Sequence, residues 1–417
     1  MSSPACRQQG SAPLTFLQQA RLERSRQARA AGSAPRSNLV TDAVSITGPL
    51  DADRLQRAAG EVRRRQPALR SRFADDHQVL APCQGADLPP PRLDRHPTAP
   101  AEFATDGPER FALFLRQIEP HQHELTLAAD HLVFDARSLE IFWENLWSAY
   151  LAPGPEEGCR CESGYLELLT APTRLSDRCR ERTEFLTALL KQRQSSFGYL
   201  DLPVRLGLDS VGSRQVSVVS QPVPAETHQR VAELARLRRT TVFAVVTAAS
   251  FAAIRDVSGA DTALLYTFLE NRRSVSARRA IGWFAATTLL ASNGPDGAGE
   301  GDEVEQAKKV LLDALICGGQ STEEVHRACG AGARHATLPS VSLSAGPAVG
   351  EAVTLGELEV TGVSAMDDPT GSVPRGRIAI EYWPQLIQLS YETDRFDAAT
   401  VQALGNAVRR QLERLVR

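Results

Sequence analysis

The sequence contains little lysine, methionine or aromatic side chain, and these scarcities exclude several classes of protein. Its 417 residues include two methionines, and lysine occurs only at Lys191, Lys308 and Lys309, so arginine supplies nearly all of the positive charge. Aromatic residues make up 6%, the formal net charge is −3 and the pI is near 6.3. A chain that binds nucleic acid would show a basic face and a much higher pI. We therefore exclude nucleic acid as a partner.

Long apolar runs and paired cysteines are missing as well. The longest apolar run, 241–254, is too short to span a bilayer, and the N-terminus lacks the apolar stretch of a signal peptide. The cysteines are odd in number, widely spread and never form a CxxC pair. They are Cys6, Cys83, Cys159, Cys161, Cys179, Cys317 and Cys329. This pattern favours reduced thiols in a cytoplasmic protein without a membrane association.

Motifs of several catalytic classes are also absent. No GxSxG elbow is present, and no glycine precedes Lys-Ser or Lys-Thr, so neither a serine-hydrolase elbow nor a P-loop is supported. His121, His123 and His131 could form a three-histidine site, and Cys159 with Cys161 could form a thiolate pair. Neither set has the ligand spacing of a known metal frame. We predict that the chain binds no metal or cofactor of its own.

What is present is an ordinary globular composition, with 42% hydrophobic and 23% charged residues. The length suggests two domains, or one fold of two lobes. Hydrophobic periodicity predicts mixed strands and helices in both halves. The main predicted elements are strands 40–47, 111–118, 124–129, 215–220, 263–268, 341–344 and 378–390, and helices 51–66, 138–150, 176–194, 225–238, 241–255, 304–315 and 398–416. We predict an α+β fold with an N-terminal lobe, 1–172, and a C-terminal lobe, 173–417.

The segment 124–143 carries the most chemical information. It runs from a strand through a short polar connection into a helix, with His131 and Asp135 in the connection and Ser138 at the helix start. A neutral imidazole can take a proton from an attacking amine or alcohol, which contributes about 10² to 10⁴ in rate. On spacing alone, a core histidine and a helix-capping aspartate are the commoner explanation.

Several segments, in order along the chain, favour a catalytic His131 over a core histidine. Residues 130–136, DHLVFDA, resemble the HHxxxDG core motif of the condensation domains of nonribosomal peptide synthetases, relatives of chloramphenicol acetyltransferase. PLTFLQQARL (13–22), RRQPALRSRF (64–73) and ENRRSVSARRAIGWFAATTLL (270–290) resemble further motifs of that family, and 387–404 resembles its last strand and helix. Matches in the family's order across nearly the whole chain are far more specific than a single HxxxD.

The resemblance implies two acyltransferase-like lobes in a V-shaped pseudo-dimer, with an active-site tunnel between them. The phosphopantetheine arm of a separate acyl or peptidyl carrier protein would enter one mouth, and an amine or alcohol the other. His131 then matches the functional histidine, and Asp135 matches the structural aspartate that pairs with an arginine of the other lobe, for which Arg272 is the best match. The resemblance assigns five residues to the tunnel or substrate: Asn271, Trp283, Phe284, Thr287 and Ser344.

Two positions depart from the motif. Asp130 stands where the family has its first histidine, and Ala136 where it has glycine. A carboxylate touching His131 would raise the pKa of the imidazole and weaken it as a base. A left-handed backbone at Ala136 would cost about 1–2 kcal/mol.

The leading hypothesis is a freestanding condensation-type acyltransferase of a secondary-metabolite pathway such as antibiotic biosynthesis. It would join a carrier-bound acyl or aminoacyl thioester to an amine or hydroxyl group as an amide or ester. One alternative is a catalytically degenerate condensation fold that recruits a carrier or another protein. Another is an epimerase or cyclase variant of the fold.

Overall fold

The computed structural model describes residues 10–30, 32, 39–83, 93–94, 103–152, 161–170, 176–197, 216–293, 302–317, 320–329, 340–343, 352–363, 378–383, 385–394 and 396–417. The chain divides into two compact units. Unit 1 comprises Met1–Thr173, Asn271–Ala285 and Pro347–Asp367. Unit 2 comprises Arg174–Glu270, Ala286–Gly346 and Asp368–Arg417.

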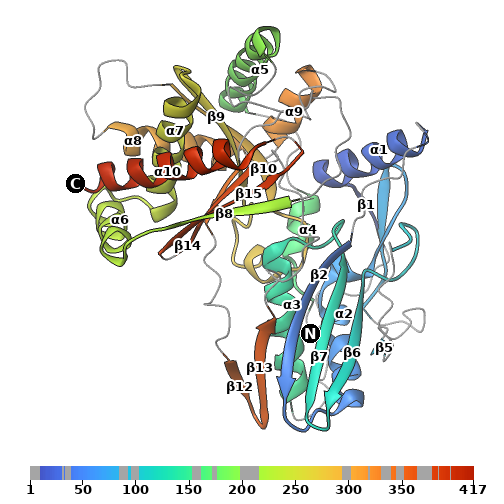
Figure 1. Cartoon of the computed structure of the whole chain (residues 1–417). Coiled ribbons are helices and arrows are strands. Elements are labelled where there is room, and N and C mark those ends of the chain that lie inside the picture. The colour runs from blue at the N-terminus through green and yellow to red at the C-terminus, as the bar shows by residue number, and fades with distance from the viewer. Residues whose placement is uncertain are drawn as a thin grey trace. The chain divides into compact units, whose positions relative to one another are not determined.

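Unit 1 is built on a six-stranded sheet of order β12-β13-β2-β7-β6-β5. Its strands are β2 (Leu39–Thr47), β5 (Leu93–Asp94), β6 (Phe111–Glu119), β7 (Gln122–Asp130), β12 (Ala352–Leu355) and β13 (Leu358–Val363). β7 pairs with β2 on one side and β6 on the other, and Figure 1 shows the β12–β13 hairpin beside β2. Alternate residues Leu125 and Leu127 are fully buried. The end of this central strand is therefore a fixed point of the sheet.

The helices of unit 1 begin where the sequence supplies caps. Helices α2 (Ala52–Arg65) and α3 (Ala136–Leu151) pack together, and each has an aspartate N-cap, Asp51 and Asp135, that accepts a backbone N–H of the first turn. Pro67 follows α2 and starts a short 3₁₀ turn. The remaining described elements of unit 1 are α1 (Phe16–Ala30), α4 (Gly164–Leu169) and the small sheet β1 (Gly10–Pro13), β4 (His77–Leu80) and β3 (Ser71–Phe73).

Unit 2 has a six-stranded sheet of order β10-β9-β11-β14-β15-β8. Its strands are β8 (Val216–Pro222), β9 (Thr262–Leu269), β10 (Ala286–Asn293), β11 (Ser340–Leu343), β14 (Ile378–Trp383) and β15 (Leu386–Glu392). Its helices are α5 (Asp177–Phe197), α6 (Ala225–Leu237), α7 (Val242–Ser258), α8 (Asp302–Cys317), α9 (Gln320–Cys329) and α10 (Ala398–Leu415). Successive residues of β9 enter different cores. Leu265 packs with α7 and α10, which lie together in Figure 1, and Leu264 packs with α5 and α9. The sheet is therefore covered on both faces.

No single helix among these described residues is long and apolar enough to cross a membrane. The helices α6 and α7 meet the length and composition test only as a pair bent by 108°. Most of α7 is buried in the core of unit 2, where it packs against α10.

The predicted α+β class is confirmed, and the predicted strands and helices that lie in described residues are present within a few residues of their predicted ends. Several elements were not predicted: α1, α4, α9, β5, β10, the small sheet β1-β4-β3 and the β12–β13 hairpin. The sequence analysis also proposed two contiguous lobes, whereas the chain returns to unit 1 with Asn271–Ala285 and Pro347–Asp367. The segment boundaries of the units depend on contacts between residues far apart in the sequence, which periodicity does not report.

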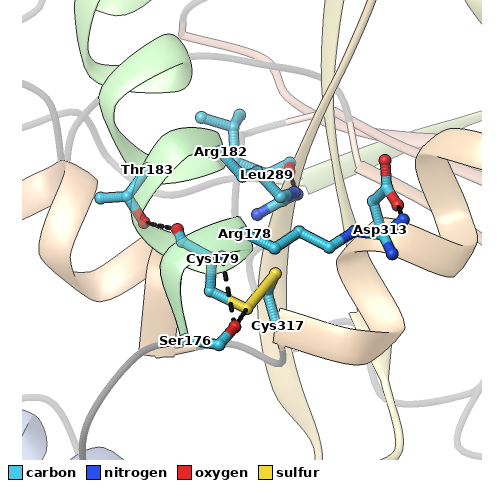
Figure 2. Close-up of a disulfide and its surroundings, with 8 residues drawn as sticks. All are labelled: Ser176, Arg178, Cys179, Arg182, Thr183, Leu289, Asp313 and Cys317. Atoms are coloured by element: carbon cyan, nitrogen blue, oxygen red, sulfur yellow. Dashed lines mark hydrogen bonds and ion pairs between the residues drawn. A yellow bond between two sulfur atoms is a disulfide. The ribbon is translucent and has the colours of Figure 1, made fainter.

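The prediction that the cysteines are reduced thiols was wrong. Cys179 and Cys317 form a disulfide in unit 2 (Figure 2), and Cys83 is also disulfide-bonded. Cys161 and Cys329 are thiols. Cys179 and Cys317 are 138 residues apart in the sequence, with their Cα atoms 5.3 Å apart. Sequence spacing gave no signal, because the fold of unit 2 brings these residues together.

Candidate active site

The connection between β7 and α3 is the centre of the candidate site. β7 ends at Asp130 and α3 begins at Ala136. Between them, the backbone N–H groups of Val133 and Phe134 both donate to the carbonyl of Asp130, at 3.0 and 3.1 Å. The side chains of Leu132, Val133 and Phe134 are fully buried. The connection is therefore a tight turn anchored in the core, and it places His131 and Asp135 at the end of the sheet.

Asp135 is held by donors from the start of α3 and from the segment 271–285, both in unit 1. One carboxylate oxygen accepts the backbone N–H of Ser138 at 2.8 Å and a guanidinium N–H of Arg272 at 2.7 Å. The other accepts the backbone N–H groups of Phe284 and Ala285, both at 2.9 Å. Such charge-assisted bonds are about twice as strong as neutral ones. With both oxygens engaged in this way, Asp135 fastens the turn to the segment 271–285.

Arg272 completes this connection from the other side. It is buried, and its guanidinium donates to the carbonyls of Ala277 and Ala280 at 2.8 and 2.5 Å as well as to Asp135. It also lies over the ring of Phe284, 4.2 Å from the ring centroid. The expected ion pair of Asp135 and Arg272 is therefore present. It was expected to join two lobes, but both residues belong to unit 1.

Ser138 adds a hydroxyl to the same cluster. Its buried Oγ lies 2.7 Å from Asp135, accepts from Arg272 at 2.9 Å and contacts both the N–H and the carbonyl of Gly282, at 3.1 and 2.8 Å. A Cβ on Gly282 would come within 2.6 Å of the Phe284 ring and 2.9 Å of the Tyr165 ring. Glycine is therefore required here, because these two rings leave no room for a Cβ.

His131 is half-buried beside this cluster. Its Nδ1 lies 2.6 Å from the carbonyl oxygen of Phe134, so Nδ1 carries the proton and donates to that oxygen. In a neutral imidazole the lone pair then resides on Nε2. The ring also stacks in a tilted arrangement on Trp283, with ring centroids 4.6 Å apart. The tautomer and the orientation of His131 are thus set by the turn and by the segment 271–285.

Asp130 has a structural role in this arrangement. Its carboxylate forms a buried ion pair with Arg110 and accepts the N–H of Leu132 at 2.9 Å. Burial raises the pKa of Asp130, and the adjacent Arg110 guanidinium opposes that rise. Arg110 is completely buried and donates further to the carbonyls of Ala104, Thr105 and Gly107. The carboxylate of Asp130 therefore binds Arg110 and the N–H of Leu132, and the contact with His131 considered in the sequence analysis is not formed.

The other predicted site residues are divided between the two units. Ala136 is the first residue of α3 and is exposed, so its backbone is right-handed and the left-handed cost does not apply. Asn271 donates to the carbonyl of Phe284 at 3.0 Å, beside the buried Trp283. Thr287 lies in β10 of unit 2, and Ser344 lies outside the described residues.

Two glutamines that sequence reasoning missed support the turn and the segment 271–285. Gln18 donates to the carbonyl of Leu132 at 2.9 Å. Gln66 donates to the carbonyl of Arg279 at 3.1 Å and accepts the N–H of Ile281 at 2.9 Å. Both side chains are fully buried. Both also lie inside segments that resemble family motifs, 13–22 and 64–73, so the signal that could have found them was already in the sequence.

The histidines at 121, 123 and 131 do not meet. His123 and His131 stand at opposite ends of β7, about 26 Å apart at the usual rise of an extended strand. Burial lowers the pKa of His123, and nearby His121 lowers it further. The site therefore contains one positioned imidazole, the hydrogen bonds of Asp135 that hold the segment 271–285, and the ring of Trp283 against the imidazole.

Comparisons with known proteins identify the family of the chain. Residues 99–327, which include the turn and the segment 271–285, match the family model described as Condensation domain. The chain belongs to the condensation domain family. Among curated members, it is similar to the nonribosomal peptide synthetase kk1B of Curvularia clavata, with 24% identity over 389 residues, covering 87% of this chain and 3% of that protein. The chain thus spans only a small part of the length of such relatives.

Solved condensation-family structures share the fold. The X-domain from teicoplanin biosynthesis matches with a TM-score of 0.73 at 18% identity, covering 97% of this chain and 94% of that chain. The same X-domain in complex with OxyB matches at 0.70 and 19%, covering 100% and 96%. The first condensation domain of the calcium-dependent antibiotic synthetase, with a substrate analogue, matches at 0.64 and 18%, covering 98% and 96%. These matches confirm the predicted chloramphenicol acetyltransferase-like fold.

Proposed function

We propose that this condensation-family chain is an acyltransferase that joins a carrier-bound acyl or aminoacyl thioester to an amine or a hydroxyl group. The observation that carries the proposal is the fixed tautomer of His131. Its Nδ1 donates to Phe134, which leaves the lone pair on Nε2, and its ring is held against Trp283. A base with a set lone pair and a set position is what proton removal from a nucleophile requires.

The proposed reaction uses the two substrates and the imidazole of His131. The nucleophile attacks the thioester carbonyl while Nε2 of His131 takes its proton, and a tetrahedral intermediate forms. The intermediate then expels the thiolate of the phosphopantetheine arm, and the imidazolium returns the proton to that sulfur. The products are an amide or ester and a free pantetheine thiol. Asp135 acts as a positioning residue, because its oxygens are engaged by Arg272 and by backbone N–H groups.

The proposed carrier protein and nucleophile are inferred from the condensation domain family. Condensation domains work with carrier proteins, and the relatives include nonribosomal peptide synthetases. We infer a carrier protein whose phosphopantetheine arm delivers the acyl group. A passage through which that arm reaches His131 stays a prediction, as do the substrate roles of Asn271, Trp283, Phe284, Thr287 and Ser344.

The test is single-turnover transfer from an acylated carrier protein to a panel of amines and alcohols. Wild type is expected to form the amide or ester, and His131→Ala to lose about 10² to 10⁴ in rate. His121→Ala is the matched control, because His121 is an exposed histidine at the opposite end of the same strand. The proposal fails if both variants transfer at the wild-type rate.

A second candidate function rests on one specific likeness. The structure matches the X-domain in its complex with OxyB, so a related fold binds a partner protein. Under this alternative, the chain recruits a partner and His131 is a structural residue. Tight binding of a carrier or another partner protein, without transfer from any acylated carrier, would favour recruitment. Loss or exchange of an α-proton label from the bound aminoacyl group would instead favour an epimerase.

A further inference from the structure

The disulfide of Cys179 and Cys317 joins two helices of unit 2 that otherwise touch little. Cys179 lies in the first turn of α5 and Cys317 is the last residue of α8 (Figure 2). The main packing of α5 is against α9, through a core that includes Leu186, Leu190 and Val325. The disulfide is therefore the principal link between α5 and α8.

One charged contact accompanies it. Arg178, next to Cys179, forms an ion pair with Asp313 of α8, and Figure 2 shows both beside the disulfide. The arginine is more than half exposed, and exposed pairs contribute little to stability. Breaking the disulfide would therefore release the start of α5 from α8 while the core that α5 shares with α9 stays intact.

The two sulfur atoms differ in their surroundings. Ser176 precedes α5, and its Oγ accepts the backbone N–H of Cys179 at 3.4 Å while its hydroxyl donates to Cys179 Sγ at 3.1 Å. The positive end of a 21-residue helix and a hydroxyl donor both favour a thiolate at Cys179. Cys317 stands at the opposite, negative end of its own helix. Cys179 is thus the better leaving sulfur, because exchange is faster when the departing thiolate is stabilised.

We propose that the Cys179–Cys317 pair is a thiol–disulfide exchange site for small-molecule thiols of the glutathione class, and that its state controls how firmly α5 is held to α8. Both cysteines are buried, at 4% and 7% exposure, so attack follows local opening of the first turn of α5. A glutathione thiolate then attacks Cys317 Sγ, the bond between the two cysteines breaks, and Cys179 leaves as a thiolate that takes a proton. A second glutathione thiolate attacks the mixed disulfide at the glutathione sulfur, which releases the Cys317 thiolate and glutathione disulfide. Each cycle oxidises two glutathiones and reduces one protein disulfide. The reverse reaction uses glutathione disulfide as the oxidant.

The whole chain is equilibrated in glutathione buffers of graded composition, without denaturant, and its thiols are trapped by alkylation. Peptide mapping then reports Cys179 and Cys317 separately from the other cysteines. The proposal predicts a reversible transition between the two states as the buffer changes. A bond that stays fully oxidised at about 10 mM reduced glutathione, or thiols that never pair, would overturn it.

Two further measurements keep exchange separate from a global loss of stability. On reduction, hydrogen exchange in the first turn of α5 should quicken about tenfold, while α9 keeps its protection. Ser176→Ala should shift the buffer composition at half-reduction about three- to tenfold toward more reducing conditions. The matched control is Thr241→Ala, which removes the N-cap of α7 in the same unit and should shift it less than twofold. Faster exchange throughout unit 2, or equal shifts in both variants, would contradict the proposal.

Discussion

Two buried aspartate–arginine pairs stand on either side of His131, and they differ in what they join. Asp130 pairs with Arg110, 20 residues away, and fastens the end of β7 to the loop around 104–107. Asp135 pairs with Arg272, 137 residues away, and fastens the start of α3 to the segment 271–285. The first pair joins residues that are close in the sequence. The second pair holds the segment 271–285, in which Trp283 stacks on the ring of His131.

The two pairs should differ in their effects on folding and on the position of His131. A charge left buried without its partner is costly in either place. Only the second pair, however, holds the segment that bears Trp283, because Asp135 binds the backbone N–H groups next to Trp283. We therefore expect both pairs to matter for folding and only one of them to matter for transfer.

The largest effect on stability should come from Asp135→Asn. The amide cannot accept from all four N–H donors and leaves Arg272 buried without its charge partner, so the free energy of unfolding should fall by about 3–5 kcal/mol. At a temperature where the variant is still folded, transfer should fall about 10²-fold through misplacement of His131. Denaturant unfolding and single-turnover kinetics measure the two effects. Wild-type transfer in a destabilised variant would show that Asp135 does not position the imidazole.

Asp130→Asn should cost less, about 1.5–3 kcal/mol. The amide oxygen can still accept the N–H of Leu132, and Arg110 keeps its three carbonyl partners. Transfer at a temperature where the protein is folded should stay within about threefold of wild type. A transfer defect as large as that of Asp135→Asn would remove the distinction between the two pairs.

Gln66→Ala tests the segment 271–285 from a second side. The change leaves the carbonyl of Arg279 and the N–H of Ile281 without their amide partner, so unfolding should become about 1–3 kcal/mol easier. Transfer should fall as well, because this segment carries Trp283. Gln117→Ala, an exposed glutamine, is the matched control and should be neutral. Equal stability in the two variants would contradict the supporting role of Gln66.

The smallest effect is expected from Ala136→Gly, which restores the residue of the family motif. Glycine at an exposed first helical position should cost less than about 1 kcal/mol, and transfer should change less than about twofold. A rise of tenfold or more would show instead that the methyl group of Ala136 obstructs the donor arm. Thermal unfolding with the same transfer assay distinguishes these outcomes.

The elements that follow from local pattern were predictable, including the strand, turn and helix around His131. Asp135 as the N-cap of α3 also follows from local chemistry, since the cap donor is three residues away. The pairing of Asp135 with Arg272 came only from the family resemblance, because no pattern in either segment points to the other. The resemblance also assigned Arg272 to the other lobe, whereas its contacts place it in unit 1 with Asp135.

Long-range contacts account for what was missed. The β12–β13 hairpin joins β2 across roughly 300 residues, and the mostly exposed side chains of β12 give little hydrophobic signal. The Cys179–Cys317 disulfide depends on the packing of α5 and α8, which spacing cannot report. Gln66 looks like an ordinary polar residue at a helix end until the fold buries it against Ile281.

The account depends most directly on which nitrogen of His131 carries the proton. Nitrogen NMR of the histidine-labelled protein, with His131→Ala to assign the signal, should show a protonated Nδ1 and an unprotonated Nε2 in the neutral ring. That result matches an Nδ1 proton donated to the carbonyl of Phe134 and a lone pair on Nε2. A neutral ring protonated at Nε2 would contradict the account, since His131 could not then act as the proposed base.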